Sequence, residues 1–378
     1  MRIAMIGQKR TGSREGGIEV VVTELATRMA ALGHEVTCYD RRGTDVNGNP
    51  APTEPYECEG VHIVPVRTVD AKGLAALTSA YSATRTALRD RPDVIHYHAE
   101  GPCNALPLAA RAGVRTVATI HGLDWQRAKW GGIASRVIKR GERKAAQKAD
   151  GLIVLSKSVQ DYFRSEYGRE TCFIPNGVNV AKTISANIIT ERWGLTEGSY
   201  FLYLGRIVPE KRPELLLEAF RSIDTDKRLV IAGGASDTSG FYGDVRTLAS
   251  RDPRVIMAGF VEGRTLEELY SNAYLYVLPS DVEGMPMSLL EAMAHGRCCV
   301  TSDIPECADV VADAGITFAQ GDAASLRDAL DALCAEPTRV VLLGEKAQIR
   351  AEVCYGWKSA VLKTIELYRG DAGETSSR

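Results

Sequence analysis

The sequence is short of excess charge and of long apolar runs. Its 46 lysines and arginines nearly balance 48 aspartates and glutamates, which gives a formal net charge of −2 over 378 residues. A chain so balanced is not built as a nucleic-acid binder. No stretch approaches 18 consecutive apolar residues, so we expect no membrane-spanning helix. The first residues lack the apolar core of a signal peptide, and we expect a cytoplasmic protein.

Paired cysteines are missing as well. The nine cysteines are an odd number and show no C-x-x-C spacing. The adjacent pair Cys298 and Cys299 cannot easily bind one zinc ion. We therefore interpret all nine as reduced, mostly structural thiols.

Short β-branched runs alternate with longer amphipathic segments, a pattern typical of βαβ units. Strands are expected at "RIAMIG", "EVTCYD", "HIVPV", "DVIHYH" and "RTVATIH", and later at "SYFLYLG", "RLVIAGG", "RVIMAGF", "LYVLPS", "RCCVTSD" and "GITFA". Helices are expected at "GIEVVVTELATRMAALG", "RPELLLEAFRSI", "RTLEELYSNA", "PMSLLEAMAHG" and from Tyr355 to about Tyr368. The fold class is therefore α/β, with two doubly wound parallel sheets in succession.

Turn residues in "FIPNGVNV", residues 173–180, mark the expected domain boundary. We predict one Rossmann-like domain over residues 1–176 and another over residues 177–354. Ligands bind beyond the carboxyl ends of parallel strands, and two such domains facing each other would enclose a ligand in a cleft. Functional residues are therefore expected in the strand-to-helix loops.

Two of these loops are candidates for binding a diphosphate. Gly16 and Gly17 directly precede a helix, where backbone amides suit an anion, although a simple flexible turn is the commoner explanation for such a pair. After the strand that ends at Gly205, Arg206 and Lys211 lie five positions apart. Arginine binds two phosphate oxygens as a fork and lysine acts as a point charge, whereas the alternative is a solvated basic loop.

The stretch "SDVEGMPMSLLEAMAHG", residues 280–296, carries two carboxylates eight positions apart. Pro286 fits the first helical position, so a helix should begin near Met285. Carboxylates accept hydrogen bonds from sugar hydroxyls, and Glu283 and Glu291 could bracket a nucleotide sugar. The alternative is that Glu283 favours the helix end and Glu291 is exposed, but the apolar residues around Glu291 predict partial burial. The first amides of this helix should point toward an anion; they belong to Met287, Ser288 and Leu289.

Together these motifs, with "GLIVLSKSVQDYF", "IPNGV" and "SDIPE", resemble retaining glycosyltransferases of family 4, from Met1 to about Tyr368. The resemblance implies the GT-B fold, in which two Rossmann-like domains face each other across a cleft. The first domain would serve the acceptor and the second the nucleotide-sugar donor. The final helix, residues 355–370, would return to the first domain.

The resemblance also implies roles for single residues. Arg206 and Lys211 would bind the donor diphosphate, Glu291 the ribose hydroxyls and Glu283 the hydroxyls of the donor sugar. The remaining implied roles are backbone contact to phosphate by Gly17, an active-site histidine at His121, and base contact by Phe260 and Val261. His121, Glu283, Arg206 and Lys211 form the expected catalytic set.

Glycosyl transfer passes through an oxocarbenium-like state while charge develops on the leaving diphosphate. Cations and helix amides aimed at that charge stabilise it, so we expect neither a metal nor a cofactor. No D-x-D loop lies at a strand end, and "DTD" at 224–226 is expected to be solvated. His96 and His98 alternate along a strand and lack a third metal ligand nearby, so acceptor or structural roles are expected for them. Glu100 is a further candidate for facing the acceptor, or a plain loop acid.

The segment 125–148 is basic, with eight lysines and arginines from Arg127 to Lys148 against the single acid Glu142, and it carries Trp125 and Trp130. Such a stretch either lies on an anionic membrane surface or forms a solvated helix face with tryptophans in the core. The first interpretation, contact with an anionic membrane surface, would place the protein at the inner face of the cell membrane.

The function that best fits is transfer of a hexosyl group from a nucleotide diphosphate sugar to a glycan or lipid-linked acceptor in cell-surface polysaccharide synthesis. One alternative is an enzyme of the same fold that epimerises or hydrolyses a sugar nucleotide. Another is a non-catalytic sugar-nucleotide-binding scaffold, although a scaffold need not keep a complete catalytic set. A nicotinamide oxidoreductase is disfavoured because the G-x-G-x-x-G fingerprint is missing.

Overall fold

The computed structural model describes residues 1–44, 49–69, 74–126, 131–234 and 239–370. The chain divides into two compact units. Unit 1 comprises Met1–Gly177 and Trp357–Arg378, and unit 2 comprises Val178–Gly356. The chain therefore leaves unit 1 after residue 177 and re-enters it at residue 357.

Unit 1 is built on an eight-stranded sheet in the order β3-β4-β2-β1-β5-β6-β7-β8. Every pairing is parallel except that of the edge strand β3 with β4. The strands are β1 (Arg2–Ile6), β2 (Glu35–Arg41), β3 (Tyr56–Cys58), β4 (Val61–Val66), β5 (Val94–His98), β6 (Arg115–Ile120), β7 (Gly151–Val154) and β8 (Cys172–Phe173).

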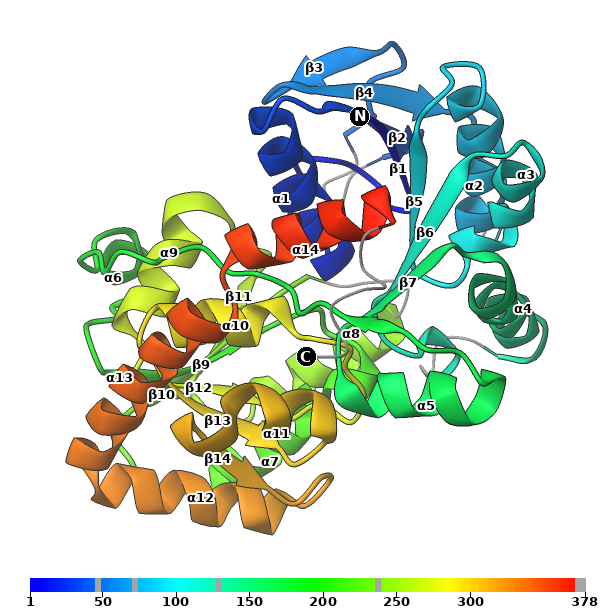
Figure 1. The fold of residues 1–378 in the computed structure, drawn as a ribbon. Coiled ribbons are helices and arrows are strands. Elements are labelled where there is room, and N and C mark those ends of the chain that lie inside the picture. Colours follow the sequence, from blue (N-terminus) through cyan, green and yellow to red (C-terminus); the bar gives the residue numbers. More distant parts are fainter. Residues whose placement is uncertain (45–48, 70–73, 127–130, 235–238, 371–378) are drawn as a thin grey trace. The chain divides into compact units, whose positions relative to one another are not determined.

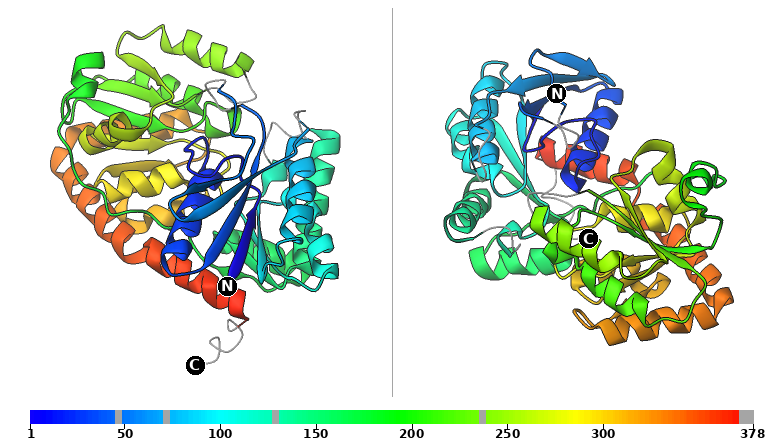
Figure 2. Two further views of the ribbon diagram at one scale, coloured as in Figure 1. Left: turned by 90° about the horizontal axis from the view of Figure 1, so that it is seen from above. Right: turned by 180° about the vertical axis from the view of Figure 1, so that it is seen from behind.

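Helices cover both faces of this sheet (Figure 1). They are α1 (Gly17–Ala31), α2 (Ala75–Ala87), α3 (Leu106–Arg111), α4 (Gly132–Lys148), α5 (Lys157–Tyr167) and α14 (Trp357–Arg369), with short 3₁₀ turns η1 (Pro102–Asn104) and η2 (Asp124–Gln126). The C-terminal helix α14 lies beside α1 (Figures 1 and 2). The central strand β5 is buried along its whole length, as expected for a parallel strand covered on both faces.

Unit 2 contains a six-stranded parallel sheet in the order β11-β10-β9-β12-β13-β14. Its strands are β9 (Tyr200–Leu204), β10 (Arg228–Ala232), β11 (Val255–Gly259), β12 (Leu275–Leu278), β13 (Cys298–Ser302) and β14 (Ile316–Phe318). Its helices are α6 (Ile188–Trp193), α7 (Pro213–Arg221), α8 (Ser239–Ala249), α9 (Gly263–Asn272), α10 (Met287–Ala294), α11 (Pro305–Val311), α12 (Ala323–Ala335) and α13 (Pro337–Cys354), with 3₁₀ turns η3 (Pro209–Lys211) and η4 (Ala312–Ala314).

In each sheet the strand order reverses at one point, between β1 and β5 in unit 1 and between β9 and β12 in unit 2. At such a point the neighbouring loops leave in opposite directions and open a crevice at the carboxyl ends of the strands. The fold class predicted from the sequence is confirmed, because both units are doubly wound α/β sheets. The first helix also ends as predicted, with Gly33 in the left-handed region at φ +85°.

One predicted boundary is wrong. Pro286 is the N-cap of α10, with an extended ψ of 113°, and not its first helical residue. The helix begins at Met287, so Glu283 lies four positions before it. The extended backbone at Pro286 lets the preceding loop turn toward the end of β9.

Candidate active site

The candidate donor site lies at the switch point of unit 2, where the loops after β9 and β12 meet. The backbone amide of Asp281 donates to the carbonyl oxygen of Glu210 at 2.8 Å and joins the two loops directly. Gly205 begins the first loop, and the N-terminus of α10 ends the second. The predicted diphosphate and sugar residues are therefore brought together although they are some 70 positions apart in the chain.

Lys211 and Glu283 form an ion pair with each other. The Nζ atom of Lys211 lies 2.6 Å from Oε1 of Glu283, and the two side chains are only 11% and 7% exposed. The hydroxyl of Ser280 donates to the same carboxylate oxygen at 2.7 Å. The sequence identifies both residues as ligand contacts but does not predict that they pair. Removing either partner of such a buried pair would leave the other charge buried without compensation.

Glu291 is half-buried, as its apolar neighbours predict. The hydroxyl of Tyr270, on α9, donates to Oε2 of Glu291 at 2.9 Å and also lies 3.2 Å from the carbonyl oxygen of Ser288. Sequence reasoning misses Tyr270, because nothing in "LEELYSNA" distinguishes it from a core aromatic. Tyr270 orients the second carboxylate of the site.

The N-terminus of α10 offers fewer amides than predicted. The amide of Leu289 donates to the carbonyl oxygen of Pro286 at 3.1 Å. It is therefore not available to an anion, and we remove Leu289 from the predicted anion-binding amides. The amides of Met287 and Ser288 precede it at the end of the helix, where donors lack intrahelical partners. The side chain of Ser288 is also engaged, since its Oγ atom lies 2.8 Å from the hydroxyl of Tyr276.

The remaining donor-side residues lie around the same edge of the sheet. Arg206 follows Gly205, is half-buried, and its side chain makes no ion pair with the described residues. Phe260 and Val261 follow β11 and are half-buried. Of the two predicted diphosphate-binding cations, Lys211 forms an ion pair with Glu283 and Arg206 forms none with the described residues.

At the switch point of unit 1, the loop after β1 approaches the end of β5 very closely. A Cβ atom on Gly7, which has φ +137°, would lie 2.3 Å from the carbonyl oxygen of His98, so only glycine fits there. Gly16 is the N-cap of α1 and Gly17 its first residue, as predicted. The Glu19 carboxylate accepts a hydrogen bond from the amide of Lys9 at 2.9 Å and so ties this loop to α1.

A row of three histidines lies at the ends of β5 and β6. The Nδ1 atom of His98 lies 3.0 Å from Nε2 of His121, and the rings of His96 and His98 are 4.1 Å apart. His96 contacts the hydroxyls of Tyr368 at 2.6 Å through Nδ1 and of Thr119 at 2.7 Å through Nε2. Neither ring nitrogen of His96 remains for an acceptor, so we correct that prediction and assign His96 to the fold. Burial lowers the pKa of His96 to about 3.

Glu100 follows the same strand and is fully buried. One of its carboxylate oxygens accepts a hydrogen bond from the amide of Asp124 at 2.9 Å. Burial, reinforced by the charge of Asp124, raises the pKa of Glu100 well above its usual range. Glu100 therefore supports the loop after β6 that carries His121.

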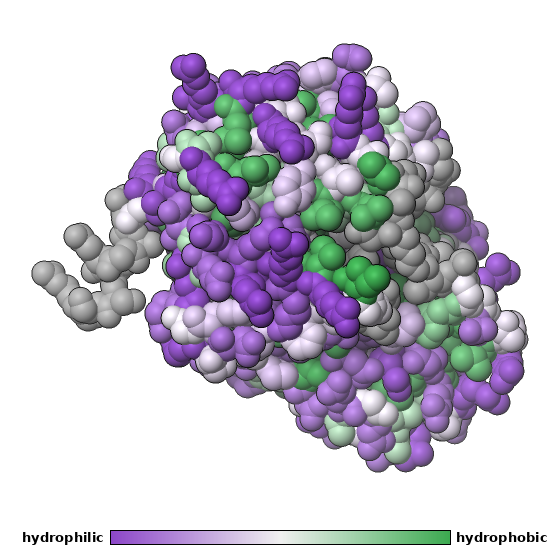
Figure 3. Space-filling model, turned by 90° about the vertical axis from the view of Figure 1, so that its right-hand side faces the viewer, coloured by the Kyte–Doolittle hydropathy of each residue, from purple (hydrophilic) through white to green (hydrophobic). Residues whose placement is uncertain are grey.

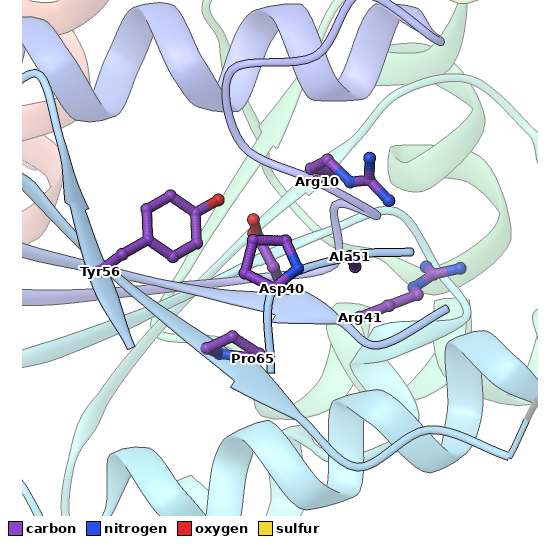
Figure 4. A pocket seen from close by; sticks show the side chains of 7 residues that line it. Arg10, Asp40, Arg41, Ala51, Tyr56 and Pro65 are labelled. Carbon is purple, nitrogen blue, oxygen red and sulfur yellow. The ribbon is translucent and has the colours of Figure 1, made fainter. Parts of the chain in front are cut away.

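A small pocket beside the loop after β1 is lined by charged side chains (Figure 4). Arg10 and Arg41 direct their guanidinium groups to the same side of it. The Asp40 carboxylate accepts hydrogen bonds from Gln8 at 3.1 Å and from the amide and hydroxyl of Thr11 at 2.8 Å. Burial nevertheless raises the pKa of Asp40 to about 6. Asp40 thus holds the β1 loop in place.

Trp125 is fixed by a polar cluster. Its indole N–H donates to Glu142 at 3.0 Å, and the hydroxyls of Tyr162 and Tyr167 donate to the other oxygen of that carboxylate at 2.7 and 2.6 Å. The Nζ atom of Lys139 lies 4.0 Å from the centre of a Trp125 ring. The predicted surface role of Trp130, with Arg127 and Lys129, lies outside the described residues.

Two doubly wound α/β units in one chain are the architecture of the GT-B fold. Residues 15–182 match Glycosyltransferase Family 4, and residues 198–336 match Glycosyl transferases group 1. The chain belongs to glycosyltransferase family 4, which confirms the resemblance seen in its motifs, and it is a nucleotide-sugar glycosyltransferase.

Relatives match over nearly the whole length. Glycogen synthase of Mycobacterium tuberculosis is 28% identical, over 97% of this chain and 94% of its own. Sucrose-phosphate synthase from Thermosynechococcus elongatus superposes with a TM-score of 0.82, at 22% identity and 98% coverage of both chains. HepE of Anabaena, in complex with UDP and glucose, superposes with a TM-score of 0.79 at 15% identity, over 98% of this chain and 100% of its own.

Two features are missing from the part of the chain that the structure describes. None of its helices combines the length and the apolar character needed to cross a bilayer. It includes no cluster of three or more histidine, cysteine, aspartate or glutamate side chains placed to hold a metal ion.

Proposed function

We propose that this protein is a retaining hexosyltransferase that works without a metal and moves a sugar from a nucleotide diphosphate to a glycan or lipid-linked acceptor in cell-surface polysaccharide synthesis. The buried pair of Lys211 and Glu283 beside the N-terminus of α10 is the observation that carries this proposal. In this pair, Lys211 is the cation that would bind the leaving diphosphate, and Glu283 is the carboxylate that would bind sugar hydroxyls.

On the donor side, charge develops on the diphosphate as the glycosidic bond breaks. Arg206 meets that charge as a fork, and Lys211 has two further N–H donors besides the one directed at Glu283. The amides of Met287 and Ser288 add the positive end of a helix. Positive groups fixed in this way stabilise the departing phosphate, so the residues of unit 2 supply what a metal would otherwise supply.

The two glutamates recognise hydroxyl groups. Glu291, held by Tyr270, accepts from the ribose, and Glu283, held by Lys211 and Ser280, accepts from the donor sugar. Phe260 and Val261 contact the base. HepE is in complex with UDP, so uracil is the first base to test.

In unit 1, the family resemblance assigns His121 to the donor sugar, and His98 lies behind His121. Glu100 is fully buried and bonded to the amide of Asp124, so we correct its prediction as an acceptor contact. Retention with same-face attack, in which the leaving phosphate takes the proton of the acceptor hydroxyl, needs no enzyme nucleophile. The name of glycogen synthase, a relative over nearly the whole chain, supports a glycan acceptor.

Contact with the cytoplasmic membrane surface is proposed for α4. Ile133, Arg136, Arg140 and Arg143 are exposed at helical spacing, and Ile133 is 78% exposed. Three of these four side chains are arginines, so the attraction would be mainly electrostatic. Figure 3 shows one face of the molecule, on which hydrophilic side chains surround smaller apolar patches. Cosedimentation with vesicles of anionic lipid, compared with neutral vesicles, tests this. Equal pelleting would remove the membrane role and leave the transferase role intact.

The experiment that tests the proposal is a thermal-shift panel of UDP, GDP, dTDP and ADP, with and without Mg²⁺. We expect one nucleotide to raise Tm equally in both conditions. Glu291→Ala should weaken its binding about 30-fold, since a charge-assisted hydrogen bond contributes on the order of 2 kcal/mol. No shift for any nucleotide would contradict the donor site.

Kinetics then separates transfer from the alternatives. Arg206→Ala should slow transfer about 30-fold, whereas Arg221→Ala, an exposed arginine at the end of α7, should leave the rate unchanged. Arg206 is a sharper probe than Lys211, because removing Lys211 leaves Glu283 buried without its cation. Nucleotide release that needs no acceptor would instead indicate a hydrolase, and conversion of the donor to its epimer without net nucleotide release would indicate an epimerase.

A further inference from the structure

The three histidines of unit 1 form a continuous row from the C-terminal helix to the active site. Tyr368 on α14 contacts His96, the ring of His96 lies against that of His98, and His98 contacts His121. His96 and His98 are fully buried, and His121 is 8% exposed. The family resemblance assigns only His121 to the reaction, and the structure assigns His96 to the fold, so the role of His98 between them is open.

The two nitrogens of His98 differ in their surroundings. Nδ1 lies 3.0 Å from Nε2 of His121, whereas the buried Nε2 atom of His98 has no hydrogen-bond partner among the described residues. A neutral imidazole carries one proton, on either nitrogen. A proton on Nε2 would bury an N–H group without an acceptor, and such orphaned donors are rare in folded proteins. The proton therefore belongs on Nδ1.

We propose that His98 is a positioning residue that donates from Nδ1 to Nε2 of His121 and thereby fixes His121 in the tautomer protonated at Nδ1. This inference deepens the proposed function, because it rests on His121 lying at the donor sugar. A neutral His121 held in this way presents an N–H donor at Nδ1. It can hydrogen-bond an oxygen of the sugar, but it cannot accept a proton at Nε2, which is occupied.

His96 keeps His98 in this state. Both of its nitrogens are engaged by the hydroxyls of Tyr368 and Thr119, so its ring is fixed, and it lies 4.1 Å from the ring of His98 at an angle of 36°. Burial, together with the neighbouring histidines, lowers the pKa of His98 well below its usual range. A neutral, immobile His98 has one donor to give, and His121 is the group that receives it.

Nitrogen-15 NMR of the histidine rings tests the tautomer directly, because protonated and unprotonated ring nitrogens resonate far apart. The chain has only six histidines, and His121→Gln identifies the signals of His121. We expect a neutral His121 that is protonated at Nδ1 in the unliganded wild type at pH 7.5. An unprotonated Nδ1 of His121 in this spectrum would overturn the proposal without any variant.

Two substitutions at position 98 add a matched comparison. His98→Asn places an amide N–H near the site of Nδ1 and should preserve the His121 tautomer, whereas His98→Leu removes the donor and should shift His121 toward protonation at Nε2. An unchanged His121 signal in His98→Leu would also overturn the proposal. Should His98→Leu fail to fold, the wild-type and His98→Asn spectra still decide the question.

The kinetic readout distinguishes positioning from mere support of the fold. His98→Leu should lower kcat about tenfold with KM for the donor nearly unchanged, and His98→Asn should restore most of kcat. Equal losses in both variants would contradict the positioning role. If NMR shows the expected tautomer but no nucleotide binds, the proposed function fails and the tautomer assignment stands.

Discussion

At the scale of single residues, the site depends on partners that the sequence does not reveal. Residue type and position suffice to select Lys211 and Glu283 in their loops and Glu291 near the start of α10. Pairing of Lys211 with Glu283 depends on two loops 72 residues apart meeting at the β9–β12 switch point. The role of Tyr270 is harder to predict from the sequence, because it arises from the contact of α9 with Glu291 on α10 and not from its neighbours in the chain.

The hydroxyl of Tyr270 should matter for nucleotide binding. Tyr270→Phe keeps the ring stacked on His295 but removes the hydrogen bond to Glu291. We expect nucleotide affinity to fall about fivefold, since one such bond contributes on the order of 1 kcal/mol. Isothermal titration calorimetry measures this. Tyr274→Phe is the matched control, because the hydroxyl of Tyr274 donates to the carbonyl oxygen of Leu333, away from the site. Equal affinities of wild type and Tyr270→Phe would refute the positioning of Glu291.

At the scale of elements, strands are predicted better than helix ends. Short runs that carry β-branched residues, such as "VIHYH" and "RLVIA", identify interior strands, because a parallel strand covered on both faces is buried along most of its length. The two-residue β8 and the antiparallel β3 leave no such signal. Pro286 is misplaced because proline fits both an N-cap and a first helical position by φ alone; only its ψ, set by the loop, decides.

A histidine at the end of α10 should make the folded state of unit 2 less stable as pH falls. His295 is the C-cap of α10, and burial lowers its pKa from 6.5 to about 4. The unfolded chain therefore takes up a proton below pH 6.5 while the folded chain does not, so stability from neutral His295 is lost as pH falls from 6.5 toward 4.

His295→Gln removes this titration. Between pH 7 and pH 4, the free energy of unfolding of the wild type should fall by about 3 kcal/mol more than that of the variant. Urea titrations of both proteins at pH 7, 5.5 and 4 give the difference. Parallel curves for the two proteins would show that His295 titrates alike in the folded and unfolded chain.

At the scale of the whole molecule, the chain returns to unit 1 through α14. The amphipathic pattern of residues 357–369 predicts a helix, but the pattern alone does not say which unit it covers. The structure answers through contacts with unit 1, where Arg115 donates to the carbonyl oxygen of Leu367 at 2.9 Å and Tyr368 reaches His96. The C-terminal helix therefore completes the histidine row, so a truncation before Tyr368 would affect the active site as well as the fold.

The place where α14 joins unit 1 gives a test of this organisation. A Cβ atom on Gly177 would lie 2.4 Å from the Trp357 ring and 2.6 Å from its Cα atom, and Trp357 is buried. Gly177→Ala should therefore overpack the junction by about 1–3 kcal/mol. A loss of this size lowers the Tm of a unit of this length by about 5 °C, which scanning calorimetry resolves.

Gly356→Ala is the matched control, at the point where the chain passes from unit 2 back to unit 1. Its added Cβ atom would meet nothing closer than the carbonyl oxygen of Glu352 at 3.8 Å, an ordinary contact. We expect its Tm to equal that of the wild type. Because Trp357 opens the helix that carries Tyr368, Gly177→Ala should also disturb the His121 ring signals, whereas Gly356→Ala should not. A Gly177→Ala protein with unchanged Tm and unchanged histidine signals would show that α14 is not held at this junction.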